Sequence, residues 1–167
     1  INYLVNAAGY FKPTSFIEHD NAIYDQYMEL NRATFFISQA VAKNMIANNG
    51  GAIVNIGSMW AQQAVKATPS SAYSMAKAGL HALTQHMAME LAQYNIRVNA
   101  VAPAVVKTPI YGSFIANDEL DSASTVVVTI CKVGGIMSLV RSTFAGEIPY
   151  LKVIGLVKAK YSPRDGG

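Results

Sequence analysis

The chain has 167 residues, and its content of 51% hydrophobic and 14% charged residues is typical of a folded globular domain and excludes a disordered chain. The net charge of +3 comes from Lys and Arg residues that are scattered without a basic run, which argues against a nucleic-acid partner. No apolar stretch reaches the ~18 residues that span a bilayer, so we expect no membrane partner. The single cysteine, Cys131, excludes an intramolecular disulfide and gives no metal-ligand spacing, which indicates a cytoplasmic protein without a metal site.

The first predicted elements are a strand and a long helix. The segment NYLVNAAG at residues 2–9 is apolar and ends in small residues, which predicts a strand that feeds a loop. Apolar residues recur at helical spacing across residues 21–48, which predicts one long helix that is irregular around Asn31. The NNGG segment at residues 48–51 predicts the C-terminal cap of that helix and a turn.

A second strand, a second helix and a third strand are predicted next. The segment GAIVNIGS at residues 51–58 is a continuous apolar run of the kind that is buried in parallel sheets. Ser70 and Ser71 predict a cap for a helix that runs to about Tyr94, and NIRVNAVAP at residues 95–103 predicts the third strand. The order strand, helix, strand, helix, strand predicts an α/β fold, a doubly wound Rossmann-like parallel sheet.

Ligands of open parallel sheets bind beyond the carboxyl ends of the strands. Three loops of this chain meet that condition: residues 6–9, 57–59 and 103–108. Helical and strand signals are mixed after residue 110. We therefore expect a single partial domain over residues 1–167, with a well-defined half at 1–110 and a divergent lid and C-terminal segment at 111–167.

Tyr73 and Lys77 lie in the second predicted helix, within SSAYSMAKAGL. Residues i and i+4 share one face of a helix, with their Cβ atoms ~6 Å apart. A nearby ammonium favours the phenolate form of a tyrosine, which can then exchange a proton with an alcohol or a carbonyl oxygen. A hydroxyl from a neighbouring loop, such as that of Ser58, would hold the same oxygen. This arrangement suits carbonyl reduction or alcohol oxidation with hydride supplied by a cofactor.

Other interpretations of these residues stay open on spacing alone. A tyrosine and a lysine four residues apart are often an exposed pair without a catalytic role. Ser74 and Lys77 match the Ser-x-x-Lys of β-lactamases, but the chain lacks the Ser-x-Asn element of that class. We expect the histidines to be solvated or satisfied by ordinary hydrogen bonds: His19, His81 and His86.

Five segments together resemble the classical short-chain dehydrogenase/reductase family, in the order and at the spacing of that family. They are LVNAAG (4–9), LN (30–31), IVNIGS (53–58), YSMAK (73–77) and IRVNAVAP with the Thr-Pro that follows it (96–109). The resemblance covers about residues 1–115. It implies a Rossmann-like fold, NAD or NADP as the cofactor, a small-molecule alcohol or carbonyl compound as the substrate, and a homo-oligomer.

The resemblance implies four catalytic residues. Tyr73 would be the acid/base, and Lys77 would lower the pKa of Tyr73 and hold the ribose hydroxyls of the nicotinamide. Ser58 would polarise the substrate carbonyl. Asn31 resembles the asparagine whose helix kink holds a water in the proton relay to Lys77.

The resemblance also implies two loops that bind the cofactor. The loop after the first strand would back its adenosine side: Asn6, Ala7, Ala8 and Gly9. The loop after the third strand would meet the nicotinamide carboxamide and the phosphates: Pro103, Ala104, Val106 and Thr108. The usual glycine of the second loop is replaced by Ala104, a small change unless that backbone needs a positive φ.

The glycine-rich phosphate-binding turn of the family, Gly-x-x-x-Gly-x-Gly, does not occur in this sequence, which begins at what would be the fourth strand of the family. The alternative expectation is therefore a catalytically incomplete fragment that acts at most as a self-association module. The apolar residues of the second helix would supply that interface: Leu80, Leu83, Met87, Met89 and Leu91.

Overall fold

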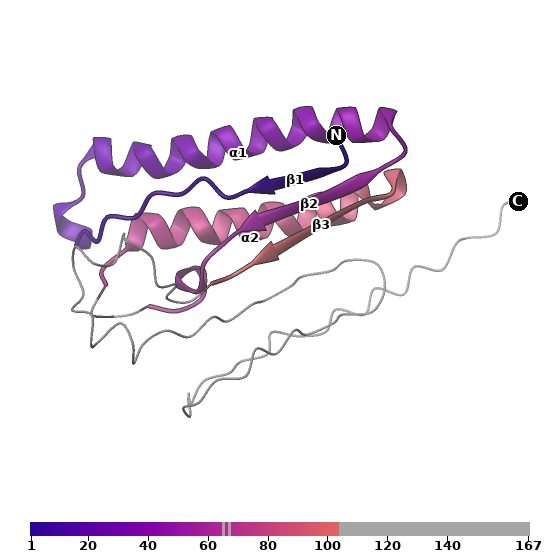
Figure 1. Cartoon of the computed structure of the whole chain (residues 1–167). Coiled ribbons are helices and arrows are strands. Elements are labelled where there is room, and N and C mark those ends of the chain that lie inside the picture. The colour runs from indigo at the N-terminus through magenta and orange to yellow at the C-terminus, as the bar shows by residue number, and fades with distance from the viewer. Residues whose placement is uncertain (65, 67, 104–167) are drawn as a thin grey trace, which may run out of the picture.

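The computed structural model describes residues 1–64, 66 and 68–103. In this part the strands form one sheet in the order β1-β2-β3, and both neighbouring pairs run parallel. The strands are β1 (Tyr3–Asn6), β2 (Gly51–Ile56) and β3 (Ile96–Val101), as Figure 1 shows. The helices are α1 (Asn21–Ala47) and α2 (Ser71–Leu91), with the 3-10 turns η1 (Phe16–Glu18), η2 (Met59–Ala61) and η3 (Ala92–Tyr94). This order confirms the predicted Rossmann-like parallel sheet; the expected lid and C-terminal segment at 111–167 lie outside the described residues.

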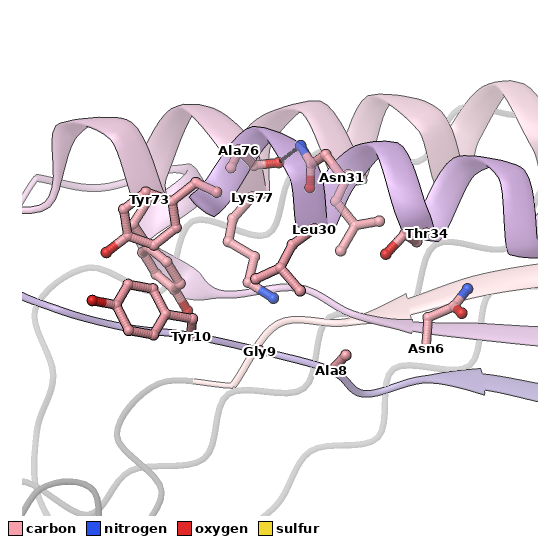
Figure 2. A pocket seen from close by; sticks show the side chains of 12 residues that line it. Asn6, Ala8, Gly9, Tyr10, Leu30, Asn31, Thr34, Tyr73, Ala76 and Lys77 are labelled. Atoms are coloured by element: carbon pink, nitrogen blue, oxygen red, sulfur yellow. Dashed lines mark hydrogen bonds between the residues drawn. The ribbon is translucent and has the colours of Figure 1, made fainter. Parts of the chain in front are cut away.

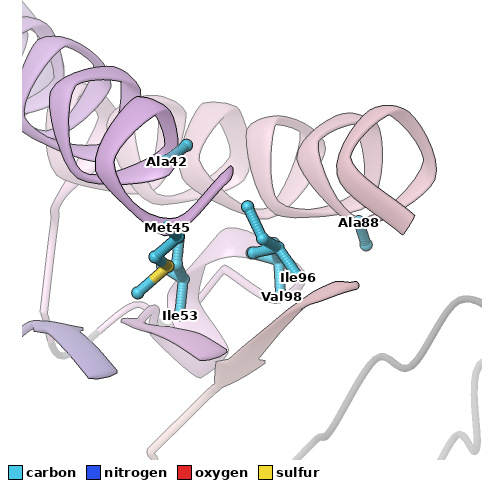
Figure 3. Packing of buried hydrophobic residues seen from close by; sticks show 6 residues of the cluster. All are labelled: Ala42, Met45, Ile53, Ala88, Ile96 and Val98. Carbon is cyan, nitrogen blue, oxygen red and sulfur yellow. The ribbon is translucent and has the colours of Figure 1, made fainter. Parts of the chain in front are cut away.

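One face of the sheet carries the hydrophobic core. The register pairs Leu4 with Ile53 and Ile53 with Val98, so these side chains share a face. Both helices pack on this face, because residues of both join β2 and β3 in a single cluster, shown in Figure 3: Ala42, Met45, Ile53, Ala88, Ile96 and Val98. On the opposite face, Tyr3 and Val5 of β1 are 76% and 59% exposed.

Helix α1 begins at a side-chain cap and ends at the predicted turn. The Asp20 carboxylate accepts a hydrogen bond from the backbone N–H of Ile23 at 2.7 Å. At the other end Asn49 and Gly50 have φ angles of 65° and 110°, which confirms the turn predicted from NNGG. The helix runs through Asn31 without a break, and the Asn31 side chain bonds to the neighbouring helix.

Helix α2 has nearly the predicted extent, and Ser70 occupies the N-cap position as predicted. Its side chain makes no capping hydrogen bond, and its Oγ lies 3.3 Å from Oγ of Ser74. The helix ends at Leu91 and tightens into η3, close to the predicted end at Tyr94. Asn95, with a φ of 57°, then turns the chain into β3.

A network of polar side chains crosses the layer between the helices and the sheet. Asn6 Nδ2 donates to Oγ of Ser38 at 2.9 Å and to Oδ1 of Asn55 at 2.8 Å. Asn55 Nδ2 donates to Oγ1 of Thr84 at 2.9 Å, and this hydroxyl donates to the carbonyl of Leu80 at 2.7 Å. The network therefore links α1, β1, β2 and α2, and it satisfies polar groups that are buried between them.

The apolar residues of α2 do not form one uniform surface. Leu80 is buried, Met87 and Leu91 pack half-buried against the core, and Met89 is 57% exposed. The self-association face expected from the sequence is thus partly core. Within the described part of the chain, neither helix combines the length and the hydropathy that crossing a membrane requires.

Candidate active site

A pocket lies where the loop after β1 passes α1 and α2. Gly9 of that loop, Asn31 of α1, and Tyr73 and Lys77 of α2 all line it. Figure 2 shows the Tyr73 ring and the Lys77 side chain descending from α2 on the side of the Gly9 loop. The carboxyl end of β1 is therefore the edge where the sheet collects these groups, as the parallel topology predicts.

Tyr73 and Lys77 lie together on one face of α2. The Lys77 Nζ atom is 5.8 Å from the centroid of the Tyr73 ring. The same Nζ donates a hydrogen bond of 2.7 Å to the carbonyl of Ile56, the last residue of β2. Burial lowers the pKa of Lys77, because removal from water disfavours the charged ammonium. The helix thus carries an amine and a phenol into one pocket.

Asn31 joins this group from the other helix. Its Nδ2 atom donates to the carbonyl of Ala76 at 2.8 Å, the contact drawn as a dashed line in Figure 2. Ala76 precedes Lys77, so the bond ties α1 to α2 directly beside the lysine. The structure therefore brings together three of the four predicted catalytic residues.

Ser58 is placed at the end of β2, and in the described part of the chain it is not among the residues that line this pocket. Its side chain is 3% exposed, and its Oγ accepts a hydrogen bond of 3.3 Å from the backbone N–H of Trp60 at the start of η2. It follows Ile56 by two residues, and the Ile56 carbonyl is the acceptor for Lys77. The backbone of residues 56–58 thus connects Ser58 to the acceptor of Lys77, while the Ser58 hydroxyl itself is buried.

Only part of the predicted cofactor loop after β1 lines the pocket. Ala8 and Gly9 line the pocket with Tyr73, whereas Ala7 is exposed and does not line it. Asn6 also borders the pocket, but its amide is engaged in the buried polar network. A Cβ added at Gly9 would meet nothing closer than 4.0 Å, so a flat ring could approach this backbone.

The predicted cofactor loop after β3 is described only at its first residue. Pro103 is half-buried, and its carbonyl accepts a hydrogen bond of 3.0 Å from the backbone N–H of Met59. The remaining predicted members lie outside the described residues: Ala104, Val106 and Thr108.

Aromatic rings surround Tyr73, which the sequence analysis did not anticipate. The Phe11 ring lies 4.8 Å from the Tyr73 ring, and the Tyr27 ring lies 5.8 Å from it, both edge to face. Phe11 also contacts Trp60 at 6.2 Å between centroids. Phe11 is two residues after Gly9, at the predicted ligand edge, and that position is the signal that would have identified it.

The prediction for the histidines is wrong at His81. His19 Nδ1 lies 2.8 Å from the carbonyl of Ser15, and His86 is exposed beside Glu90. Nε2 of His81 is buried and has no hydrogen-bond partner among the residues described. The signal was its position, four residues after Lys77 on the same face of the helix.

The residues that line the pocket offer contacts suited to part of a nicotinamide nucleotide. Ala8 and Gly9 leave the backbone accessible to a flat ring, and Lys77 and Tyr73 provide donors for the hydroxyls of a ribose or for a substrate oxygen. In the described part of the chain, no group of three or more His, Cys, Asp and Glu residues is arranged to hold a metal ion.

Comparison with known proteins identifies the family. The family model for short chain dehydrogenases matches residues 1–119. The chain is 43% identical over 110 residues to 2-dehydro-3-deoxy-D-gluconate 5-dehydrogenase of Escherichia coli, over 65% of this chain and 43% of that protein. It is also 43% identical over 110 residues to L-xylulose reductase of Homo sapiens, over 65% of this chain and 44% of the reductase.

Solved structures give the same result. The crystal structure of a gluconate 5-dehydrogenase from Burkholderia cenocepacia, in complex with NADP and tartrate, is 28% identical with a TM-score of 0.66, over 72% of this chain and 47% of that chain. The chain spans less than half the length of the relatives named here. The family model matches well over half of the chain, and the resemblance drawn from the sequence motifs is confirmed: the chain belongs to the short chain dehydrogenase family.

Proposed function

We propose that the chain carries the proton-transfer residues of an NAD(P)-dependent oxidoreductase that interconverts a secondary alcohol and a ketone. The observation that supports this most directly is the shared pocket of Tyr73 and Lys77, with the ammonium 5.8 Å from the phenol ring and the accessible Gly9 backbone opposite. The relatives that are 43% identical over 110 residues are named as a dehydrogenase and a reductase.

Each residue has a distinct part in the proposal. In reduction, the Tyr73 hydroxyl donates a proton to the substrate carbonyl oxygen, and in oxidation it accepts the proton of the alcohol. The Lys77 ammonium stabilises the resulting phenolate. Asn31 holds α1 against α2 beside the lysine, and the hydroxyl of Ser58, which follows β2, polarises the substrate carbonyl. The bound nicotinamide supplies or accepts the hydride.

We further propose a polyhydroxylated substrate. The relatives are named for a deoxygluconate derivative, xylulose and gluconate, and one of their structures holds tartrate. Hydroxyl-bearing side chains also border the pocket near Tyr73: Tyr10 and Thr34. Such groups can donate and accept hydrogen bonds to the hydroxyls of an open-chain polyol.

The proposal is tested on the purified 167-residue chain. NADH and NADPH are titrated in by calorimetry. In a separate assay NAD+ or NADP+ is supplied as the oxidant, and the absorbance of the reduced nicotinamide that forms is followed with galactitol, D-arabinitol, D-gluconate and, as a smaller alcohol, acetoin. We expect cofactor binding and turnover of at least one polyol. Tyr73→Phe should lower kcat by about 100-fold or more, because the acid/base is removed, while cofactor affinity changes by less than about threefold.

The matched control is Tyr94→Phe. Tyr94 is exposed on η3 and does not line the pocket, so this variant should keep the wild-type rate. Turnover that is equal in the wild type and in Tyr73→Phe would overturn the proposed role of Tyr73. Absence of cofactor binding at millimolar concentrations would overturn the proposal that this chain acts as an oxidoreductase.

A further inference from the structure

His81 directs a polar ring into the interior of the protein. It lies on α2, one turn after Lys77, and its Nε2 atom is buried without a hydrogen-bond partner among the described residues. Burial first, and the charge of Lys77 second, lower the pKa of His81. The fold therefore favours the neutral imidazole at this position. A buried polar atom without a hydrogen-bond partner lowers the stability of the fold, so another contact of the ring must explain its position.

The ring is directed at Gly57. A Cβ placed on Gly57 would collide with Nε2 of His81, and it would stand 2.7 Å from Cδ2 and 3.1 Å from Cε1. Gly57 is buried, and its φ is not in the region that demands glycine, so the ring and not the backbone conformation excludes a side chain here. The imidazole thus takes the space that a side chain at position 57 would fill.

Lys77 and His81 contact consecutive residues at the end of β2. Lys77 Nζ donates to the Ile56 carbonyl at 2.7 Å, and the His81 ring lies against Gly57, which Ser58 follows. One turn of α2, from Lys77 to His81, therefore corresponds to one step along the chain, from Ile56 to Gly57. This register holds Lys77 at one place on the strand and leaves its ammonium in the pocket of Tyr73.

We propose that His81 is a positioning residue for Lys77: its neutral ring, seated on Gly57, holds α2 in register with the end of β2 and keeps the Lys77 ammonium on the Ile56 carbonyl beside Tyr73. The catalytic consequence rests on the proposed function, whereas the contact itself does not. Protonation of His81 places a second cation beside Lys77 and displaces the ammonium, so acid inactivates the pair.

The charges around His81 support this consequence. On its own helix the ring is subject to the positive charge of Lys77. The part of β2 that it faces is uncharged, and so is Val101 of β3, whose carbonyl accepts from the N–H of Gly57 at 2.7 Å. Within the described residues, no acidic side chain acts on the His81 ring to offset the added proton.

The first test is an NMR titration of the three histidines in the 167-residue chain and in its Lys77→Met variant. We expect the titration midpoint of His81 to move upward in Lys77→Met, because one of the two causes that lower it is removed. The signal of the exposed His86, on the same helix, should not move. An unchanged His81 midpoint would overturn the electrostatic link between the two residues.

The second test follows the side-chain signals of Lys77 (Cε and Nζ) in variants that change the contact. His81→Gln removes the titrating ring, so it should shift the Lys77 signals and abolish their response to acid below the ordinary histidine pKa of ~6.5. Gly57→Ala displaces the ring but keeps a titratable histidine, so it should shift the Lys77 signals as well. The matched control is His86→Gln, which should leave them as in the wild type. Wild-type Lys77 signals in both His81→Gln and Gly57→Ala would overturn the proposal.

A kinetic readout separates this inference from the proposed function. His81→Gln should lower kcat on the order of 10-fold, because a shift of the lysine misplaces the acid/base pair, and it should flatten the acid limb of the pH profile. A protein that is inactive in the wild type contradicts the proposed function, while the NMR tests still decide the role of His81. An active protein in which His81→Gln keeps the acid limb contradicts the inference alone.

Discussion

Lys77 is the residue in which burial and charge conflict most directly. Its ammonium is placed in a pocket that removes it from water, and this lowers its pKa from the ordinary value of ~10.4. Between the lowered value and ~10.4 the unfolded chain holds more protons than the folded chain, so the contribution of Lys77 to stability increases with pH in this window. The charged form that assists Tyr73 is lost in the same window.

The alkaline limb of the pH profile should therefore report Lys77. We expect kcat to fall as the pH rises through the lowered pKa of Lys77, before ~10.4 is reached. Lys77→Arg should be slower at pH 7, because a guanidinium does not reproduce the geometry of an ammonium, but it should retain its rate to higher pH because arginine stays charged. The measurement is kcat against pH for both proteins, and identical alkaline limbs would contradict this assignment.

Asn55 is the central residue of the buried polar network. It is fully buried, it accepts from Asn6 and it donates to Thr84. Removing its amide leaves two buried partners without their hydrogen bonds, and each such loss costs about 1–3 kcal/mol.

Asn55→Ala should accordingly destabilise the fold by roughly 3 kcal/mol, a decrease in Tm of about 6–12 °C for a chain of this size. The measurement is thermal unfolding by circular dichroism. Asn99→Ala is the control, because Asn99 lies on the neighbouring strand and its Oδ1 is buried without a partner among the described residues. A loss in Asn99→Ala as large as that in Asn55→Ala would show that the network is not the cause.

At the scale of the elements, the connection from α1 to β2 depends on Gly50. Its φ of 110° is unfavourable for any residue with a side chain, and a Cβ there would collide with the backbone carbonyl of Asn95 at the start of β3. Gly51 next to it donates from its backbone N–H to that same carbonyl at 3.2 Å. This turn therefore sets the distance between β2 and β3 at the ends where both strands begin.

Two alanine substitutions separate backbone strain from helix propensity. Gly50→Ala should lower the free energy of unfolding by about 1–3 kcal/mol, because it combines a strained φ with a backbone collision. Gly79→Ala should raise it by about 0.5–1 kcal/mol, since Gly79 lies inside α2, is exposed, and has its nearest neighbour, Asn31 Nδ2, 3.5 Å from the new Cβ. Urea unfolding measures both. A Gly50→Ala protein as stable as the wild type would contradict the strain.

At the scale of the whole molecule, the helical layer carries apolar side chains that the described part of the chain leaves exposed. Phe35, Phe36 and Ile37 of α1 are all of this kind, and Arg32 lies 5.5 Å from the Phe36 ring. Exposed aromatic residues that adjoin an arginine are typical of protein interfaces. If the homo-oligomer that the family resemblance implies forms, this face of α1 is its expected interface.

Phe36→Glu should weaken this self-association at least about tenfold, because it places a carboxylate in an apolar contact. Sedimentation equilibrium of the wild type and the variant measures the change. Phe16→Glu is the matched control, since Phe16 is 80% exposed on η1, outside α1, and its loss should not alter the mass. A monomeric wild type would contradict the inference.

The sequence by itself determined the order and type of the elements. Continuous apolar runs, helical spacing and the NNGG turn are local patterns, and the strands and helices follow them closely. The spacing of Tyr73 and Lys77 likewise placed both on one helical face, since four residues make about one turn.

Tertiary structure alone decided which partners these residues meet. Asn31 bonds to Ala76, Asn6 to Asn55, and His81 lies against Gly57, each across a large separation in sequence. The expectation that His81 is solvated or satisfied by hydrogen bonds failed at Nε2 for the same reason. A polar side chain can bond only to partners within a few ångströms. Which groups lie that close depends on how the helices pack on the sheet, and the local sequence pattern does not encode that packing.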